Sequence, residues 1–498
     1  MKNCDLLIRN ARIYNGLGDG PDNGPSPGPA NISNGAVADL AVDGDRIVDL
    51  GPGLDYHAAH EFDARGLALA PGFIDVHTHD DTAVLRTPQM LPKISQGVTT
   101  VIVGNCGISA SPVTLHADPP DPMNLLGGRD DFRYPTFREY ISAIAEARPA
   151  VNVAALIGHT ALRSNHMNRL DRAATEAEVG AMRAHLDDAL AGGALGLSTG
   201  LAYLSAIHAT TEEVIALAQP LAAHHAVYTT HLRSETETIL DALREAFTIG
   251  DQSQVPVIVS HLKCAGIANW GRSPEVLSAL EAVRETQAVG CDCYPYAAGS
   301  STLDLRQVDE RVAITITWST PHPEVSGQPL ARIAESWGVT QLEAARRLQP
   351  AGAIYHSISE EDMRRILAHP ATMIGSDGLP LDPRPHPRLW GTFPRVLGRY
   401  SREEKLLPLA AAIHKMTGMP AARFGLEGRG VLTPGAFADL VLFDPESVTD
   451  TATYSDPIQP AKGISHVWVN GVLTYTAQES TGERAGRFLP RGRTRWIQ

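Results

Sequence analysis

Cysteine is scarce in this chain, with five residues among 498. Cys4, Cys106, Cys264, Cys291 and Cys293 are too few and too scattered for a disulfide framework, and they are consistent with a reducing compartment. Cys291 and Cys293 alternate along an apolar stretch, so we expect both to be small core residues.

Long hydrophobic runs are also lacking. No apolar stretch is long enough to span a bilayer. The first residues contain neither a continuous apolar segment nor a cleavage-site pattern, so no secretory signal is expected. We therefore expect a cytoplasmic protein that has no membrane partner.

Positive charge is in short supply, because 42 Lys and Arg face 56 Asp and Glu and leave a net charge of −14. This balance argues against a nucleic-acid partner. An anionic small-molecule substrate would need a few local basic residues. The remaining composition, 43% hydrophobic and 20% charged, is typical of a globular protein. The oligomeric state stays open, with a monomer as one alternative.

The two ends of the chain have similar patterns of strand candidates and turns. Residues 1–68 contain short alternating segments separated by turns, and AVDGDRIV carries a hairpin signal. Residues 428–498 contain further strand candidates around the turn dipeptide Asn470-Gly471. Neither end can bury a sheet face alone, so we expect both to form one small β-sandwich domain. The segment 16–35 is rich in Gly, Pro and Asn and predicts a surface loop.

Residues 69–427 alternate between short apolar runs and amphipathic segments, which indicates an α/β fold. Thr175, with Glu178 three residues later, predicts one helix start. Eight apolar runs are the number needed for a closed (β/α)8 TIM barrel. An open doubly wound sheet is less favoured because no Gly-rich phosphate loop follows the first run. Residues 297–358 interrupt the alternation, and we interpret them as an inserted lid over the barrel mouth.

Potential metal ligands recur where these runs end. In a parallel barrel the carboxyl ends of the strands form the active-site face, so side chains from distant segments meet there. Each residue alone has a simpler interpretation as a structural histidine, a buried thiol or a turn cap. Their recurrence favours a metal site. The candidates are His77 and His79, Cys106, His231, His261, and Asp377.

The ligand types favour zinc, because thiolate and imidazole suit a borderline-soft ion. A catalytic zinc needs three protein ligands and one open position. Cys106, His231 and His261 are candidates for that triad, with Asp377 near the fourth position. His77 and His79 would then hold a second, weaker ion or shape the water site.

Several motifs resemble the amidohydrolase superfamily, and within it the D-aminoacylase branch of N-acyl-D-amino-acid deacylases. The motifs are PGFIDVHTHDD, GNCG, GLAY, THLR, SHLK, YPY, GSDG, PHPRLWGTFPRVLGRY and GAFADLVLFDP. The resemblance implies a distorted barrel and zinc-dependent hydrolysis of an N-acyl-D-amino acid to a D-amino acid and a carboxylate.

The resemblance also implies residue roles. It places a tight zinc on Cys106, His231 and His261, and a weaker one on His77, His79 and Asp377. It gives Asp377 the acid/base role. Its implied substrate contacts, several around an α-carboxylate, are Lys263, Tyr203, Tyr294, Ser300 and Arg388.

Side-chain specificity stays open between general, D-glutamate-specific and D-aspartate-specific deacylases. Arg306 follows the motif SSTL; pointing inward it would recognise an acidic substrate, and otherwise it is a surface residue.

Other functions are less favoured. A cyclic amidase would normally carry a lysine on the fourth strand, where this chain reads GALGLSTGLAY. A nucleobase deaminase would need a helix-borne glutamate after the sixth strand, and SHLKCAGIANW offers none. A non-catalytic zinc protein would have a saturated metal shell. The tripeptide LSA that follows GLAY departs from the Pro-Gly found in many relatives. The expected preference for D-amino acids rests on the resemblance alone.

Overall fold

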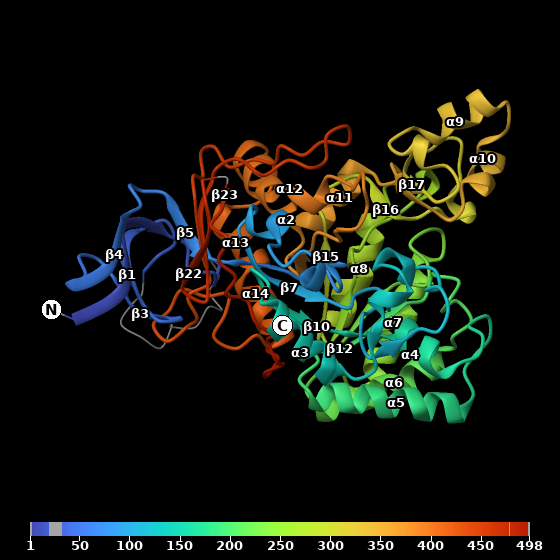
Figure 1. Ribbon diagram of the computed structural model, residues 1–498, viewed down its shortest axis with the longest axis horizontal. Helices are drawn as coiled ribbons and strands as arrows, with labels where there is room; N and C mark the ends of the chain where they lie inside the picture. The colour runs from blue at the N-terminus through green and yellow to red at the C-terminus, as the bar shows by residue number, and fades with distance from the viewer. Residues whose placement is uncertain (1, 19–31, 478, 497–498) are drawn as a thin grey trace.

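The computed structural model describes residues 2–18, 32–477 and 479–496, so most of the loop predicted at 16–35 lies outside the described residues. Figure 1 shows a β-rich part, coloured blue and red, beside a larger α/β part. In the described residues, both chain ends contribute strands to one nine-stranded sheet. These strands are β1 (Lys2–Ile13), β2 (Val37–Asp43), β3 (Arg46–Gly51), β4 (Tyr56–Asp63), β5 (Ala68–Pro71), β20 (Leu440–Phe443), β21 (Ile464–Val469), β22 (Val472–Thr476) and β23 (Glu479–Ser480).

The two chain ends meet where β5 pairs antiparallel with β20, on the path β20-β5-β1. Alternation along β1 places Leu6 and Ile8 in one apolar cluster and Leu7 in another, so both faces of this strand are covered. The predicted turn at Asn470-Gly471 is confirmed, since both residues have positive φ between β21 and β22. The sandwich arrangement stays a prediction.

Among the described residues, nine strands of the larger part form two parallel arcs in chain order. One arc has the order β6-β7-β10 and the other β11-β12-β13-β14-β15-β19. The strands are β6 (Phe73–Asp75), β7 (Val98–Val103), β10 (Asn152–Ala155), β11 (Ile157–Gly158), β12 (Gly196–Gly200), β13 (Val227–His231), β14 (Val257–Val259), β15 (Val289–Cys293) and β19 (Thr372–Ile374). A parallel bridge from Thr78 to Gly378 links the first strand to the last, and Leu156 separates β10 from β11. Backbone hydrogen bonds among the described residues therefore do not join these strands into one continuous closed sheet.

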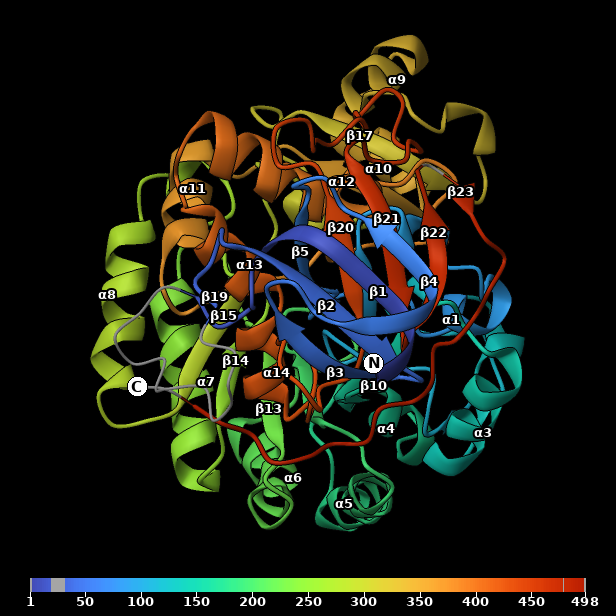
Figure 2. The same ribbon diagram turned by 90° about the vertical axis from the view of Figure 1, so that its left-hand side faces the viewer.

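Helices surround these strands, as Figure 2 shows. The helix α5 begins at a side-chain cap, because Thr175 accepts a hydrogen bond from the Glu178 amide, which confirms the predicted helix start. The helices are α3 (Phe137–Ala147), α5 (Glu176–Ala191), α6 (Thr211–Ala223), α7 (Ile239–Ser253), α8 (Ser273–Arg284) and α11 (Glu360–Ala368). No helix of the described residues is both long and apolar enough to cross a membrane.

The inserted segment forms a small unit with its own apolar cluster, drawn at the upper right of Figure 1. Its antiparallel strands are β16 (Gly299–Thr302), β18 (Ala351–Tyr355) and β17 (Ile314–Ser319), and its helices are α9 (Leu330–Trp337) and α10 (Gln341–Leu348). The unit contacts the rest of the chain through Ser300, whose carbonyl accepts a hydrogen bond from Arg388 at the start of α12 (Arg388–Arg395). The insertion therefore contributes to the surroundings of the site.

Candidate metal centre

His77 and His79 follow β6 and are both buried. Asp377, which follows β19, lies beside them, with its Oδ1 3.2 Å from His79 Nε2 and 3.5 Å from His77 Nε2. The Asp377 amide also donates to the His77 carbonyl over 2.6 Å. Backbone pairing between the first and last strands thus holds this carboxylate against the two imidazoles.

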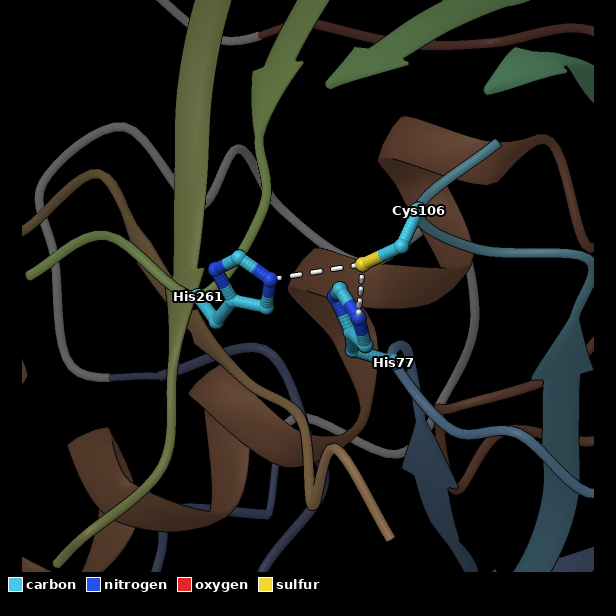
Figure 3. A group of neighbouring side chains, drawn as sticks. All are labelled: His77, Cys106 and His261. Carbon is cyan, nitrogen blue, oxygen red and sulfur yellow. Dashed lines mark hydrogen bonds between the residues drawn. The ribbon is translucent and has the colours of Figure 1, made fainter. Parts of the chain in front are cut away.

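Cys106 follows β7 and lies between two imidazoles, as Figure 3 shows. Its Sγ is 3.2 Å from His77 Nε2 and 3.3 Å from His261 Nε2. Around a tetrahedral zinc, bonds of about 2.3 Å to sulfur and 2.0 Å to nitrogen place the two ligand atoms roughly 3.5 Å apart. The observed separations therefore suit a shared ion.

His231 ends β13 beside the same cluster. Its ring centroid lies 4.5 Å from that of His261, and its Nε2 lies 3.8 Å from Glu235 Oε2. The structure thus gathers all six predicted ligands. Its close groups are His77 with Cys106 and His261, His77 with His79 and Asp377, and His231 with Glu235 and His261. His77, expected at the weaker position, is one of the two imidazoles nearest the thiol.

Backbone conformation is unusual at three of these positions. Cys106, His261 and Asp377 have φ of 53°, 35° and 50°, a region that residues other than glycine rarely adopt. Gly104 makes the loop at Cys106 possible, because a Cβ there would meet the Leu156 carbonyl oxygen at 2.1 Å. Strain of this kind is typical of functional sites, where the surrounding packing holds it in place.

The electrostatics favour charged ligands. Burial would raise the pKa of Cys106, but His77 and His261 outweigh it and hold that pKa well below its usual range. Burial would likewise raise the pKa of Asp377, yet Arg388 and then His79 hold it well below the ordinary value. Arg388 Nη2 is 2.9 Å from Asp377 Oδ2. The thiolate and the carboxylate are the forms that bind metals.

Two acidic residues near the ligands were not among the predicted site residues. Asp292 lies 3.3 Å from His77 Nδ1 and accepts the His261 amide, and Glu235 lies 3.1 Å from His261 Nδ1. Cys291 and Cys293 are buried, as predicted. Strand alternation around them was the available signal for Asp292, because it turns the intervening residue to the opposite face.

Behind the histidines lies a second buried charge cluster. Lys93, in α2 (Leu91–Ile94), places its Nζ 2.7 Å from Asp75, 2.8 Å from Thr78, 3.0 Å from Ser376 and 3.1 Å from Asp80. All five side chains are buried. This cluster ties the segment around β6 to the residues that follow β19.

All five predicted substrate contacts lie around the metal centre. Tyr203 Oη is 3.4 Å from His231 Nδ1, and the Arg388 guanidinium lies 4.5 Å from the Tyr294 ring centroid. Several of their buried polar atoms have no hydrogen-bond partner among the described residues. These atoms are Tyr294 Oη, Ser300 Oγ, and Nε and Nη1 of Arg388.

The other two basic candidates are already paired. Lys263 Nζ lies 2.6 Å from Glu235 Oε1 and 2.8 Å from His261 Nδ1, so its charge is largely balanced. The Arg306 side chain is 47% exposed, and two of its nitrogens donate to the Asp304 carboxylate at 3.0 and 2.7 Å. The ion pair of Arg306 favours its interpretation as a surface residue. The role of Lys263 as a substrate contact stays a prediction.

Buried imidazoles, a thiolate and a carboxylate at the carboxyl ends of parallel strands define an α/β protein built to hold a metal ion. Comparison with known proteins identifies the group. The chain belongs to the amidohydrolase family, whose profile matches residues 60–475.

Close relatives cover nearly the whole chain. D-aminoacylase of Alcaligenes xylosoxydans xylosoxydans is 51% identical over 92% of this chain and 94% of that protein. N-acyl-D-aspartate deacylase of the same organism is 48% identical over 98% and 95%. The crystal structure of N-acyl-D-glutamate deacylase from Bordetella bronchiseptica, complexed with zinc and a phosphonate mimic of the tetrahedral intermediate, is 43% identical with a TM-score of 0.92. The match covers 98% of this chain and 100% of that one.

Proposed function

We propose that this protein hydrolyses N-acyl-D-amino acids to a D-amino acid and a carboxylate. The observation that carries the proposal is Asp377, a buried carboxylate in contact with both the histidine cluster and Arg388. The activities named for the close relatives support the reaction class and the D-configuration. We further infer a distorted (β/α)8 barrel over residues 69–427, a lid at 297–358, and a β-sandwich domain from residues 1–68 and 428–498.

Zinc is the metal that the donor set fits best, because a thiolate with imidazoles is a soft site. Cys106, His231 and His261 would hold the tight ion. His77 Nε2 lies 3.2 Å from Cys106 Sγ, a separation that suits two ligands of one ion. A second, weaker ion would use His77, His79 and Asp377. When bound, the metal supplies Lewis-acid polarisation of the scissile carbonyl and lowers the pKa of water.

Asp377 is suited to move the proton. Its pKa is depressed, so it is a carboxylate at neutral pH and able to accept the proton of the attacking water on an Oδ atom. The same oxygen would then return that proton to the leaving amide nitrogen. His79 and Arg388 hold the carboxylate in place for both transfers.

The substrate α-carboxylate would be bound by the unpartnered donors around the centre. Arg388 keeps Nε and Nη1 free of partners among the described residues, and Tyr294 Oη and Ser300 Oγ are buried beside it. Buried donors left unpaired cost free energy, and a carboxylate would satisfy several of them at once. Lys263, whose Nζ lies 5.9 Å from the centroid of the Tyr294 ring, would add a positive charge beside this carboxylate. Through its contact with His261 Nδ1 it would also orient that ligand.

The preference among side chains follows from Arg306. Because Asp304 already balances this guanidinium, we propose that neutral D-amino acids are better substrates than D-glutamate or D-aspartate. The alternative, an acidic-substrate deacylase, is favoured by the two relatives of that activity.

The test is a panel of N-acetyl D- and L-methionine, leucine, glutamate and aspartate, assayed by amino-acid release during a zinc titration. Release from the D-series, larger for the neutral side chains, is the expected result. Hydrolysis confined to L-substrates would refute the function, and a preference for acidic D-substrates would refute only the specificity.

A further inference from the structure

A cavity of about 790 Å³ lies at the opposite ends of the strands from the metal centre. Pro370 lines it just before β19, whereas Asp377 follows the other end of that strand. The helices α13 (Leu409–Met416) and α14 (Gly418–Phe424) form one wall, and the C-terminal tail at 493–495 forms another. Figure 2 shows both helices in the neighbourhood of β15 and β19.

The lining is strongly cationic although the whole chain carries a net charge of −14. Among the described residues, Glu427 is the one carboxylate in the lining. It accepts the backbone amide of Arg493 and so helps to fix the tail. The cationic side chains are Arg284, Lys415, Arg423, Arg429, Arg493 and Arg495.

Two of these cations have acidic partners. Arg284 pairs with Glu281, and Arg429 pairs with Asp439. For Lys415, Arg423, Arg493 and Arg495, no ion pair is present within the part of the chain that the structure describes.

Lys415 and Arg423 are the unusual pair, because both are more than nine-tenths buried. Lys415 Nζ donates to the carbonyls of His369 and Thr372, and Arg423 Nη1 donates to the Ala371 carbonyl. Backbone carbonyls hold the two groups in place but do not neutralise them. Burial lowers the pKa of Lys415 to about 7 and that of Arg423 to about 10, which reflects this lack of compensation.

We propose that this cavity binds a small organic anion that carries a phosphate or more than one carboxylate. Buried charge without a counterion is costly, and a multivalent anion would offset it. Guanidinium groups bind both head groups through paired hydrogen bonds. The volume suits a metabolite-sized ligand, and Leu17, Met419 and Leu426 give its organic part an apolar surface.

The experiment measures binding of inorganic phosphate, and separately of succinate, to the zinc-loaded protein by calorimetry at constant ionic strength. The test variant is R493Q/R495Q, which removes two exposed arginines from the cavity. Its matched control is R138Q/R332Q, two exposed arginines elsewhere, so the net charge changes equally. Any binding of phosphate at the metal centre is common to all three proteins and cancels from the comparison.

The wild type and the control should bind at least one of the two anions saturably. The test variant should bind it about tenfold more weakly. Phosphate binding without succinate binding would identify a ligand that carries a phosphate. Succinate binding without phosphate binding would identify a dicarboxylate. K415M provides a second variant. It should weaken binding of the same anion while the zinc content stays unchanged. Absence of saturable binding, or equal weakening in test and control variants, would overturn the proposal.

Discussion

Replacing Lys93 by Met removes the one cation of a buried cluster that joins the segment around β6 to the residues after β19. Lys93 Nζ lies 2.7 Å from Asp75 and 3.1 Å from Asp80, and all three side chains are buried. At an effective dielectric of about 20 these contacts are worth roughly 6 and 5 kcal/mol before desolvation. Desolvation of the ammonium offsets several kcal/mol, so we expect Lys93→Met to lower the free energy of unfolding by about 3–5 kcal/mol.

The effect should depend on pH in a definite direction. Burial and then Asp75 raise the pKa of Asp80, against the lowering effect of Lys93, so loss of the cation raises it further. An acid whose folded-state pKa exceeds its unfolded value destabilises the fold increasingly as pH rises. The deficit of the variant should therefore grow between about pH 4 and pH 7.

Denaturant titration of the zinc-loaded protein measures this deficit, with exposed Lys405→Met as the control. The triple variant K93M/D75N/D80N should recover part of the lost stability, because it removes the unpaired carboxylates as well. A loss below about 1 kcal/mol, or a triple variant less stable than K93M, would refute the account of a charge left unpaired.

Further predictions concern the metal centre and its ligands. Asp377→Asn should reduce kcat by about 10²–10⁴-fold while metal analysis finds the tight zinc retained; near-normal kcat would exclude the proton-transfer role. Cys106→Ala should lose that zinc on gel filtration, and an unchanged zinc-to-protein ratio would contradict its place as a ligand. Tyr294→Phe should raise KM about tenfold for an N-acetyl-D-amino acid but not for its carboxamide, because only the former presents the carboxylate. Arg306→Ala should leave the ratio of kcat/KM for N-acetyl-D-methionine and N-acetyl-D-glutamate unchanged; a shift greater than about fivefold would show that Arg306 contacts the side chain.

The sequence was informative about the site because strand ends converge. His77, Cys106, His231, His261 and Asp377 each follow or end a short apolar run, and the fold brings all of them together. The order of strands does not determine how far each side chain reaches inward. The position of His77 beside the Cys106 thiol therefore depends on the folded structure and not on strand order.

Residues whose role depends on a partner were harder to predict. Glu235 lies in a loop, and nothing in its local pattern indicates that it takes up the charge of Lys263. The sequence allows Arg306 either to point inward or to lie on the surface. The structure shows that the Asp304 carboxylate accepts hydrogen bonds from its guanidinium. Lys93 lies in a four-residue helix, and in the sequence it is an isolated charge between Pro92 and Ile94.

The antiparallel pairing of β5 with β20 has a consequence for synthesis of the chain. Pro71 pairs with Leu440, so the partner of β5 leaves the ribosome only after nearly all of the chain has been made. At 5–20 residues per second, this is a delay of roughly 20–70 s. During that time one side of β5 has no strand to pair with, so nascent or C-terminally truncated chains should be the forms most prone to aggregate and to engage chaperones.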